Sequence, residues 1–266
     1  MNQADNYIDI NRKLWNERAK VHAKSEFYDF AGFRGGKTSL NRIELEELGD
    51  VKGKKLLHLQ CHFGQDTISW AREGAEVTGV DFSDEAISMA QKLAREEGIN
   101  AEFICCDIYD LKNHLHEKFD IVFTSYGVIG WLPDMEKWAG IVAHYLKPGG
   151  VFYMAEFHPV VWMFDNGFTK FGNSYFKGDA IIETVTKTYT DGGAHAEATE
   201  IGWNHSLGEV ISALTKQGLQ IEFLHEFPYS VYNCFANTVQ GADGLWRIKG
   251  LENIIPMMYS VKATKP

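Results

Sequence analysis

The sequence predicts an α/β protein built on a doubly wound, mostly parallel sheet of seven strands. From Lys54 to residue 157, short apolar runs alternate with segments whose apolar residues recur at helical spacing. Each apolar run ends in a polar or small residue where the helical pattern begins. Such βαβ units form a parallel sheet with helices on both faces and right-handed crossovers. Ligands of these sheets bind beyond the carboxyl ends of the strands, where the winding reverses.

The first fifty residues carry helical signals. Ile10, Leu14 and Val21 fall at helical spacing, so one face of a helix there is expected to pack against the rest of the protein. The elements expected before the sheet are a helix over 7–22, a glycine-rich turn over 31–36 and a helix near 38–48 that ends at Gly49.

Glycine, proline and capping residues mark the ends of elements in the alternating region. Ser83 is placed to cap the helix that follows it, and Gly74 and Gly98 stop helices. Pro133-Asp134 opens a further helix. The expected strands span 55–60, 76–82, 101–107, 119–126 and 151–157, the expected helices span 64–73, 84–97 and 134–146, and a turn covers 147–150.

The pattern changes after residue 157. Two β-branched stretches, 181–190 and 194–203, flank Asp191-Gly192-Gly193, which predicts a β-hairpin. The run from Ser206 to Glu209 has the spacing of a capping box and starts a helix that stops at Gly218. Strands over 219–227 and 255–264 complete the sheet. The expected organisation is a helical segment over 1–50, then one domain over 51–266 with an insertion at about 158–205.

Composition narrows the class of protein. The net charge of −10 argues against a nucleic-acid partner, because such proteins usually present basic faces. No apolar run approaches the roughly 20 residues of a membrane span, and the first residues lack the apolar stretch of a signal peptide, so we expect no membrane association. The cysteines have no disulfide or metal-site spacing, which predicts reduced thiols and a cytoplasmic protein. They are Cys61, Cys105, Cys106 and Cys234.

Asp81 is the first candidate ligand-binding residue. It ends the second strand, about twenty residues after the end of the first, where a carboxylate can accept hydrogen bonds from both hydroxyls of a ribose. The alternative is that Asp81 only caps the next helix. Ser83 already suits that role, which favours the ribose interpretation.

The ordered strand ends LLHLQCHFGQDT, EVTGVDFS, FICCDIYD, FDIVFTSYG and LKPGGVFYMAE resemble those of class I S-adenosylmethionine-dependent methyltransferases that act on small molecules. The resemblance implies a Rossmann-like methyltransferase fold and S-adenosylmethionine as cofactor. It implies that Asp107 accepts from the adenine amino group and that Ile108 covers the ring. The segment from Trp15 to Ala19, followed by Tyr28, resembles a helix that folds over the cofactor, so residues 1–50 are expected to be a lid.

The loop after the first strand departs from that family. The family usually has an acidic residue in the strand and three glycines at alternate positions, where this chain has His58, Gln60, His62 and Gly64. Glycine allows positive φ and close approach of the backbone, so we expect the loop to differ in detail. The side chains of Gln60 and His62 are expected to meet the methionyl carboxylate and ammonium, or else to be ordinary turn residues. Cys61 lies between them.

A nicotinamide-dependent oxidoreductase is a weaker interpretation. The fingerprint GxGxxG is absent, and a pyrophosphate needs close backbone approach at a helix N-terminus. A third interpretation is non-enzymatic, a degenerate fold that binds a metabolite or serves as an interaction module. The atypical loop is its main support.

The methyl acceptor is expected beyond strands four and five. His158 is the first choice for a base or substrate contact, because imidazole titrates near neutrality, with a structural role before Pro159 as the alternative. Tyr126 is the best-placed phenol, and Ser125 and Phe82 are expected to contact the cofactor. Trp131 either walls the sulfonium or packs a helix.

Aromatic residues either line a pocket for a small, partly apolar acceptor or only pack at the surface; they are Trp162, Phe164, Phe168, Tyr229 and Tyr232. The histidines are scattered without ligand spacing, so no metal site is predicted. No oligomeric state is predicted.

Overall fold

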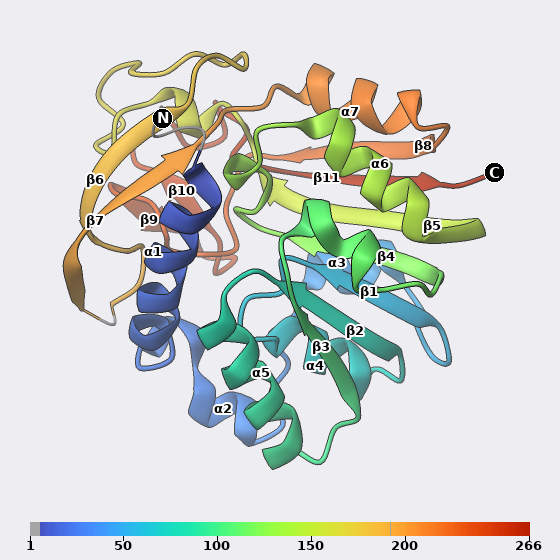
Figure 1. The fold of residues 1–266 in the computed structure, drawn as a ribbon. Coiled ribbons are helices and arrows are strands. Elements are labelled where there is room, and N and C mark those ends of the chain that lie inside the picture. The colour runs from blue at the N-terminus through green and yellow to red at the C-terminus, as the bar shows by residue number, and fades with distance from the viewer. Residues whose placement is uncertain (1–5, 192) are drawn as a thin grey trace.

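The computed structural model describes residues 6–191 and 193–266. Seven strands form one sheet in the order β3-β2-β1-β4-β5-β11-β8 (Figure 1). The first five are parallel to one another, and β11 is antiparallel to both β5 and β8. This confirms the expected doubly wound fold, with the winding reversed between β1 and β4. The strands are β1 Lys55–Leu59, β2 Glu76–Asp81, β3 Ala101–Cys105, β4 Phe119–Ser125, β5 Leu146–Phe157, β8 Gln220–Phe227 and β11 Met258–Thr264.

Helices cover both faces of the sheet because the apolar residues of each strand point alternately to the two sides. In β1, Leu57 and Leu59 belong to one hydrophobic cluster, and Leu56 belongs to another on the opposite face. One face is covered by α3 Arg42–Leu48, α4 Gln65–Arg72 and α5 Asp84–Glu96. The other is covered by the 3-10 helix η3 Ile108–Asn113, by α6 Met135–Tyr145 and by α7 Leu207–Lys216.

Side-chain caps fix where the helices begin. The hydroxyl of Ser83 accepts from the backbone N–H of Ala86 at 3.1 Å, as expected. At α7 the hydroxyl of Ser206 accepts from the N–H of Glu209, but the Glu209 carboxylate turns to His205 instead of completing the capping box. The predicted start of α7 is therefore confirmed with only half of the predicted cap.

Two local predictions were wrong, and one element was missed. Residues 31–36 are not a turn, because Asp29 accepts from the N–H of Gly32 and starts a short helix, α2 Phe30–Arg34. The turn expected at 147–150 lies within β5, since Gly149 and Gly150 exchange backbone hydrogen bonds with Lys265. A small hairpin of β9 Thr238–Gln240 and β10 Trp246–Ile248 was not foreseen.

The insertion contains the predicted hairpin. Strands β6 Ile181–Lys187 and β7 Ala194–Gly202 form a separate antiparallel sheet. Gly192, in the predicted turn, lies outside the described residues. Helix α1 Tyr7–His22 lies between this hairpin and α5 (Figure 1). Hence two segments far apart in the sequence form one layer over the end of the sheet.

The contact between α1 and β7 is polar and buried. The side-chain amide of Asn11 donates to the carbonyl of Ile201 at 2.7 Å and accepts from its N–H at 3.0 Å. The guanidinium of Arg18 bonds the carboxylate of Glu200 at 2.6 Å. The expected apolar face is only partly right, because the buried stripe of α1 is mostly polar. It consists of Asn11, Leu14, Arg18, Ala19 and His22, whereas Ile10 and Val21 are half-buried.

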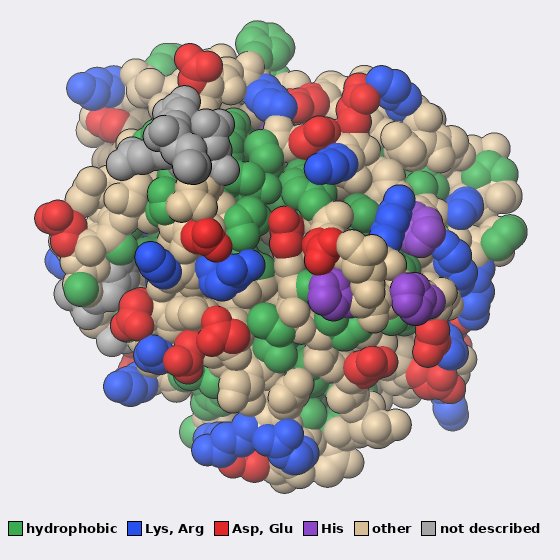
Figure 2. Space-filling view, viewed as in Figure 1, with side chains coloured by type: hydrophobic (Ala, Val, Ile, Leu, Met, Phe, Trp, Pro, Cys, Tyr) green, Lys and Arg blue, Asp and Glu red, His purple; other side chains and the backbone are tan. Residues whose placement is uncertain are grey.

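The outer surface is mixed in charge on the face drawn in Figure 2. Acidic and basic side chains are intermixed over most of this face, and hydrophobic side chains show between them in the upper middle of the view. In the described part of the chain, no helix has the length and apolar character needed to cross a membrane.

Replacing Asn11 with alanine is expected to lower the free energy of unfolding by about 2–3 kcal/mol, since both backbone groups of Ile201 lose their partner in a buried place. Urea unfolding measures this. Lys13→Ala, an exposed change on the same helix, is the control and is expected to shift stability by less than about 0.5 kcal/mol. Equal effects of the two changes would show that this contact does not hold α1 on the hairpin.

Candidate functional site

A cavity of about 1270 Å³ opens at the carboxyl ends of the first five strands. Helix α1 and the β6–β7 hairpin line it from the opposite side, with Trp15, Arg18 and Tyr189 among the contributing residues. All residues expected to hold the cofactor line this one cavity: Gln60, Cys61, His62, Gly64, Asp81, Phe82, Asp107, Ile108, Ser125 and Tyr126. The structure therefore brings them together, while the group that each binds stays a prediction.

The loop after β1 has left-handed backbone conformation at three alternate residues. The angle φ is 57° at Gln60, 50° at His62 and 77° at Gly64. Only Gly64 is a glycine, so at Gln60 and His62 a residue with a side chain adopts the positive φ that glycine favours. A left-handed conformation costs a residue with a side chain about 1–2 kcal/mol. Strain of this kind clusters at ligand sites.

Asp81 helps to hold the strained loop. Its Oδ2 accepts from the backbone N–H of His62 at 2.9 Å, and its Oδ1 accepts from the N–H of Ser83 at 2.9 Å. Burial raises the pKa of Asp81 to about 6, while the backbone N–H bonds oppose the rise. Each oxygen keeps a lone-pair direction for a further donor. Asp81 thus contributes to the loop and lines the cavity at the same time.

Asp107 follows β3, the edge strand of the sheet, and lines the side of the cavity away from β4. Its Oδ1 accepts from the N–H of Tyr109 at 3.0 Å and caps η3. Burial raises the pKa of this carboxyl group. The neighbouring Ile108 is buried and lines the cavity. Both residues line the cavity, capping is the role of Asp107 that the structure shows, and the adenine contact stays a prediction.

The side chains of Gln60 and His62 both line the cavity, but they differ in their hydrogen-bond partners. The amide of Gln60 donates to the carbonyl of Val128 at 2.9 Å, and in the described part of the chain its buried Oε1 has no hydrogen-bond partner. The Nε2 of His62 lies 3.0 Å from Nδ1 of His22. Burial, with the nearby Arg18, lowers the pKa of His62 to about 3, so this imidazole is neutral.

His158 does not have the orientation expected from the sequence. It is absent from the cavity lining; its Nδ1 accepts from the N–H of Val160, and its Nε2 lies 2.9 Å from a carboxylate oxygen of Glu226. The strand alternation that would aim it at the cavity ends at Phe157, the last residue of β5. The placement matches the structural role before Pro159, and the geometry does not favour His158 as a base.

Tyr126 occupies the expected place at the end of β4. It lines the cavity, has a strained φ of 28°, and donates its phenolic hydrogen to Oε2 of Glu44 at 2.7 Å. The adjacent Ser125 donates to the half-buried Asp66 at 3.2 Å. Burial raises the pKa of Tyr126 well above its usual range, so the phenol is neutral.

Arg18 is a cavity residue that the sequence reasoning missed. Its guanidinium lies 5.4 Å from the ring centroid of Trp15 and 5.6 Å from that of Trp131. Within the described residues, its buried Nε has no hydrogen-bond partner. The signal was available, because Asn11, Arg18 and His22 fall in the buried stripe of an amphipathic helix, where polar residues are unexpected.

Glu156 shapes the loop after β4. Its carboxylate accepts from the N–H groups of Gly127, Val128, Ile129 and Phe157. The carboxylate thereby fixes the backbone on which Tyr126 and Trp131 are carried.

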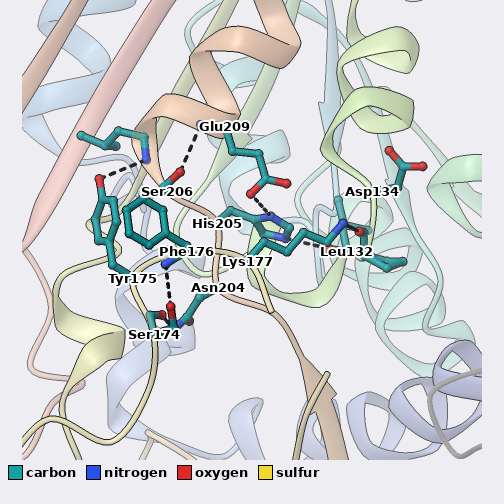
Figure 3. A network of polar contacts seen from close by, with 12 residues as sticks. Leu132, Asp134, Ser174, Tyr175, Phe176, Lys177, Asn204, His205, Ser206 and Glu209 are labelled. Atoms are coloured by element: carbon teal, nitrogen blue, oxygen red, sulfur yellow. Dashed lines mark hydrogen bonds and ion pairs between the residues drawn. The ribbon is translucent and has the colours of Figure 1, made fainter. Parts of the chain in front are cut away.

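A polar network fastens the insertion to α7 and to the loop after β4 (Figure 3). The ring of His205 lies between Glu209, at 3.1 Å, and the carbonyl of Leu132, at 2.8 Å. The phenol of Tyr175 accepts from the N–H of Leu207, and Lys177 donates to the carbonyl of Pro133. His205 borders the cavity, but its ring is committed to these contacts. In the part of the chain that the structure describes, no group of three or more potential ligands could hold a metal ion.

The chain is similar to known methyltransferases in sequence. The family described as methyltransferase domain matches residues 50–211. The ubiquinone biosynthesis O-methyltransferase of Salmonella typhimurium is 33% identical over 140 residues, which are 51% of this chain and 57% of that protein. The chain thus spans little more than half the length of such curated relatives.

Solved structures share the fold. A putative S-adenosylmethionine dependent methyltransferase from Listeria monocytogenes superposes with a TM-score of 0.56 at 20% identity, covering 84% of this chain and 98% of the other. A methyltransferase from Mesorhizobium loti superposes with a TM-score of 0.55 at 20% identity, covering 82% and 93%. At these identities the likeness concerns the fold.

Gly64→Ala is expected to destabilise the protein more than Gly98→Ala. Both residues have positive φ, 77° and 65°, but an added Cβ at Gly64 would lie 2.6 Å from the ring of Phe103, whereas Gly98 has open space. Both changes cost the left-handed strain of about 1–2 kcal/mol, and the clash adds about 1–3 kcal/mol at Gly64 alone. Chemical unfolding measures the difference; equal losses would mean that Phe103 yields without cost.

Proposed function

This chain belongs to the class I S-adenosylmethionine-dependent methyltransferase family, and from that premise we propose that it transfers the methyl group of S-adenosylmethionine to a small organic acceptor. The observation that carries the proposal is the loop after β1. Gln60, His62 and Gly64 keep left-handed backbone beside the carboxylate of Asp81, in one cavity. Strained backbone of this kind clusters at ligand-binding sites, which supports the proposal.

The residues present fit the proposed cofactor. Asp81 offers lone pairs to the ribose hydroxyls, and Asp107 with Ile108 would hold the adenine. The buried Oε1 of Gln60 has no partner in the described residues and suits an ammonium group. The buried guanidinium of Arg18 suits the methionyl carboxylate, because Arg binds carboxylates through several N–H groups.

When bound, S-adenosylmethionine supplies a methyl group on a sulfonium that leaves as a neutral thioether. The protein has to align the acceptor with that methyl group and exclude water. Helix α1 and the β6–β7 hairpin cover the cavity and would exclude water as a lid. Tyr126 at the end of β4 is the side chain that we assign to the acceptor's reacting atom.

The acceptor side of the cavity is aromatic. Trp162, Phe164, Phe168 and Tyr232 line it, as expected from the sequence, whereas Tyr229 does not. Such walls suit an acceptor with an apolar or aromatic body. A relative's name, an O-methyltransferase of ubiquinone biosynthesis, is consistent with a small-molecule acceptor. A non-enzymatic, metabolite-binding role is the alternative, and turnover of an acceptor would exclude it.

The folded protein is expected to bind S-adenosylhomocysteine in isothermal titration, and Asp81→Ala is expected to weaken binding more than about tenfold. The loss reflects hydrogen bonds to a charged acceptor, about 1.5–3 kcal/mol. Asp110→Ala, an exposed change in η3, is the control and is expected to leave the affinity unchanged. Absence of binding by wild-type protein with an intact thermal transition would reject the proposed function.

Affinity for S-adenosylhomocysteine is expected to fall in acid. Ribose hydroxyls donate to the ionised form of Asp81, whose pKa is about 6 before binding. The dissociation constant should therefore be level above about pH 7 and rise, at most about tenfold per pH unit, as the pH falls below 6. Titrations from pH 5 to 8 measure it. Persistence of the same acid slope in Asp81→Ala would assign it to another group.

A further inference from the structure

A buried carboxylate lies directly behind the cavity wall. Glu44 is completely buried and does not line the cavity, but its Oε2 accepts from the phenol of Tyr126, which does. Its Oε1 accepts from the backbone N–H of Asn41 at 2.8 Å and from the Asn41 side chain at 3.0 Å. The chain thus connects the reacting side of the cavity, through one phenol, to an acid that no water or ligand reaches directly.

The surroundings of Glu44 are free of compensating charge. Its hydrogen-bond partners are neutral, and in the described part of the chain no Lys, Arg or His lies within ion-pair distance of it. The titratable groups that face it include Asp66 from α4, Tyr126 from the end of β4, Tyr153 from β5 and Tyr232. Burial, reinforced by Asp66, raises the pKa of Glu44 to about 7.

Glu44 also completes the capping box of α3 with Asn41. A capping box is served equally by glutamine, which carries no charge. Glu156, another buried carboxylate, differs because it accepts from four backbone N–H groups. The cap therefore does not explain why residue 44 is an acid. Because the hydrogen-bond partners of Glu44 are neutral, its protonation is free to change.

We propose that Glu44 is the final receiver of the proton that the methyl acceptor loses, and that Tyr126 relays this proton from the cavity. The proposal rests on the function proposed above and deepens it, since it assigns the acceptor to molecules whose reacting oxygen or nitrogen still carries a hydrogen. Tyr126 touches the acceptor. Glu44 acts through Tyr126, by positioning its phenol and taking up its proton.

The proton transfer is balanced. As the new bond from carbon to the acceptor heteroatom forms, the acceptor's hydrogen moves to Oη of Tyr126 and the hydrogen of Tyr126 moves to Oε2 of Glu44. The phenol is left neutral and Glu44 becomes a carboxylic acid. The positive charge of the sulfonium is lost when the bond from sulfur to carbon breaks with its electron pair on sulfur. It reappears as the proton on Glu44, and this proton returns to the cavity through Tyr126 after the methylated product leaves.

In this arrangement the charge of the bound ligand changes the protonation of Glu44. A sulfonium in the cavity favours ionised Glu44, and a neutral thioether does not. Binding of S-adenosylmethionine should therefore expel a proton from Glu44, which prepares it to receive the next one, whereas binding of S-adenosylhomocysteine should not. Both ligands meet Asp81 through the same ribose, so its contribution cancels between them.

The test is isothermal titration of wild-type protein with each of the two ligands at pH 7, in buffers of different ionisation enthalpy. The number of protons released is the slope of binding heat against buffer enthalpy. At this pH about half of Glu44 is protonated, so S-adenosylmethionine is expected to release up to about half a proton more than S-adenosylhomocysteine. The excess should shrink toward pH 9.

Three variants test whether the excess of protons released with S-adenosylmethionine comes from Glu44. Glu44→Gln keeps the capping box and is expected to remove the excess. Glu47→Gln is the matched control, since Glu47 lies on the same helix and accepts from Tyr153, which does not line the cavity. Tyr126→Phe removes a bond that lowers the pKa of Glu44 and should move the excess to higher pH. The ligands' own amino groups contribute equally in wild type and variants.

The outcomes separate the two proposals. If both ligands bind but wild type and Glu44→Gln release protons identically, Glu44 is a cap only and the inference is overturned. If neither ligand binds the folded protein, the proposed function fails instead. If Glu44→Gln does not fold, the wild-type excess and its shift in Tyr126→Phe decide, and an excess that does not change with pH contradicts the proposal.

Discussion

The carboxylate of Asp81 joins the two strand ends on which the whole site is built. Through one oxygen it holds the N–H of His62 after β1, and through the other it holds the N–H of Ser83 after β2. Gln60 is held independently by the carbonyl of Val128 beyond β4. Strained backbone persists only where surrounding contacts determine it from several sides. Three neighbouring strand ends provide that here, so the loop keeps its left-handed residues without the glycines that usually occupy them.

Most of the fold could be predicted because its signals are local. Periodicity distinguishes strands from helices, and Ser83, Gly74 and Gly98 mark helix ends by their own backbone chemistry. Errors arose where a distant partner decides the local structure. Residues 147–150 read as a turn, yet they pair with Lys265 more than a hundred residues later.

Site residues at the ends of strands could be predicted from the sequence, whereas site residues on α-helices could not. Asp81 and Tyr126 follow directly from the place where their strands stop, because a parallel sheet brings its carboxyl ends together. His158 was misplaced because alternation along β5 stops at Phe157, and the chain then turns toward Glu226. Arg18 and Glu44 were missed because their helices were judged by apolar residues alone, and a buried polar residue shows its purpose only when its partner is known.

The polar seam between α1 and β7 has a consequence for how such a chain can diversify. Asn11 bonds only backbone groups of Ile201, 190 residues away, whereas Arg18 depends on the side chain of Glu200. A foreign hairpin without Glu200 would leave Arg18 as a buried charge without its counterion, a loss of about 3–5 kcal/mol. A new acceptor specificity is therefore most readily obtained by exchanging helix α1 and the hairpin together. The alternative is to change aromatic residues of the cavity that do not take part in the contact between α1 and β7.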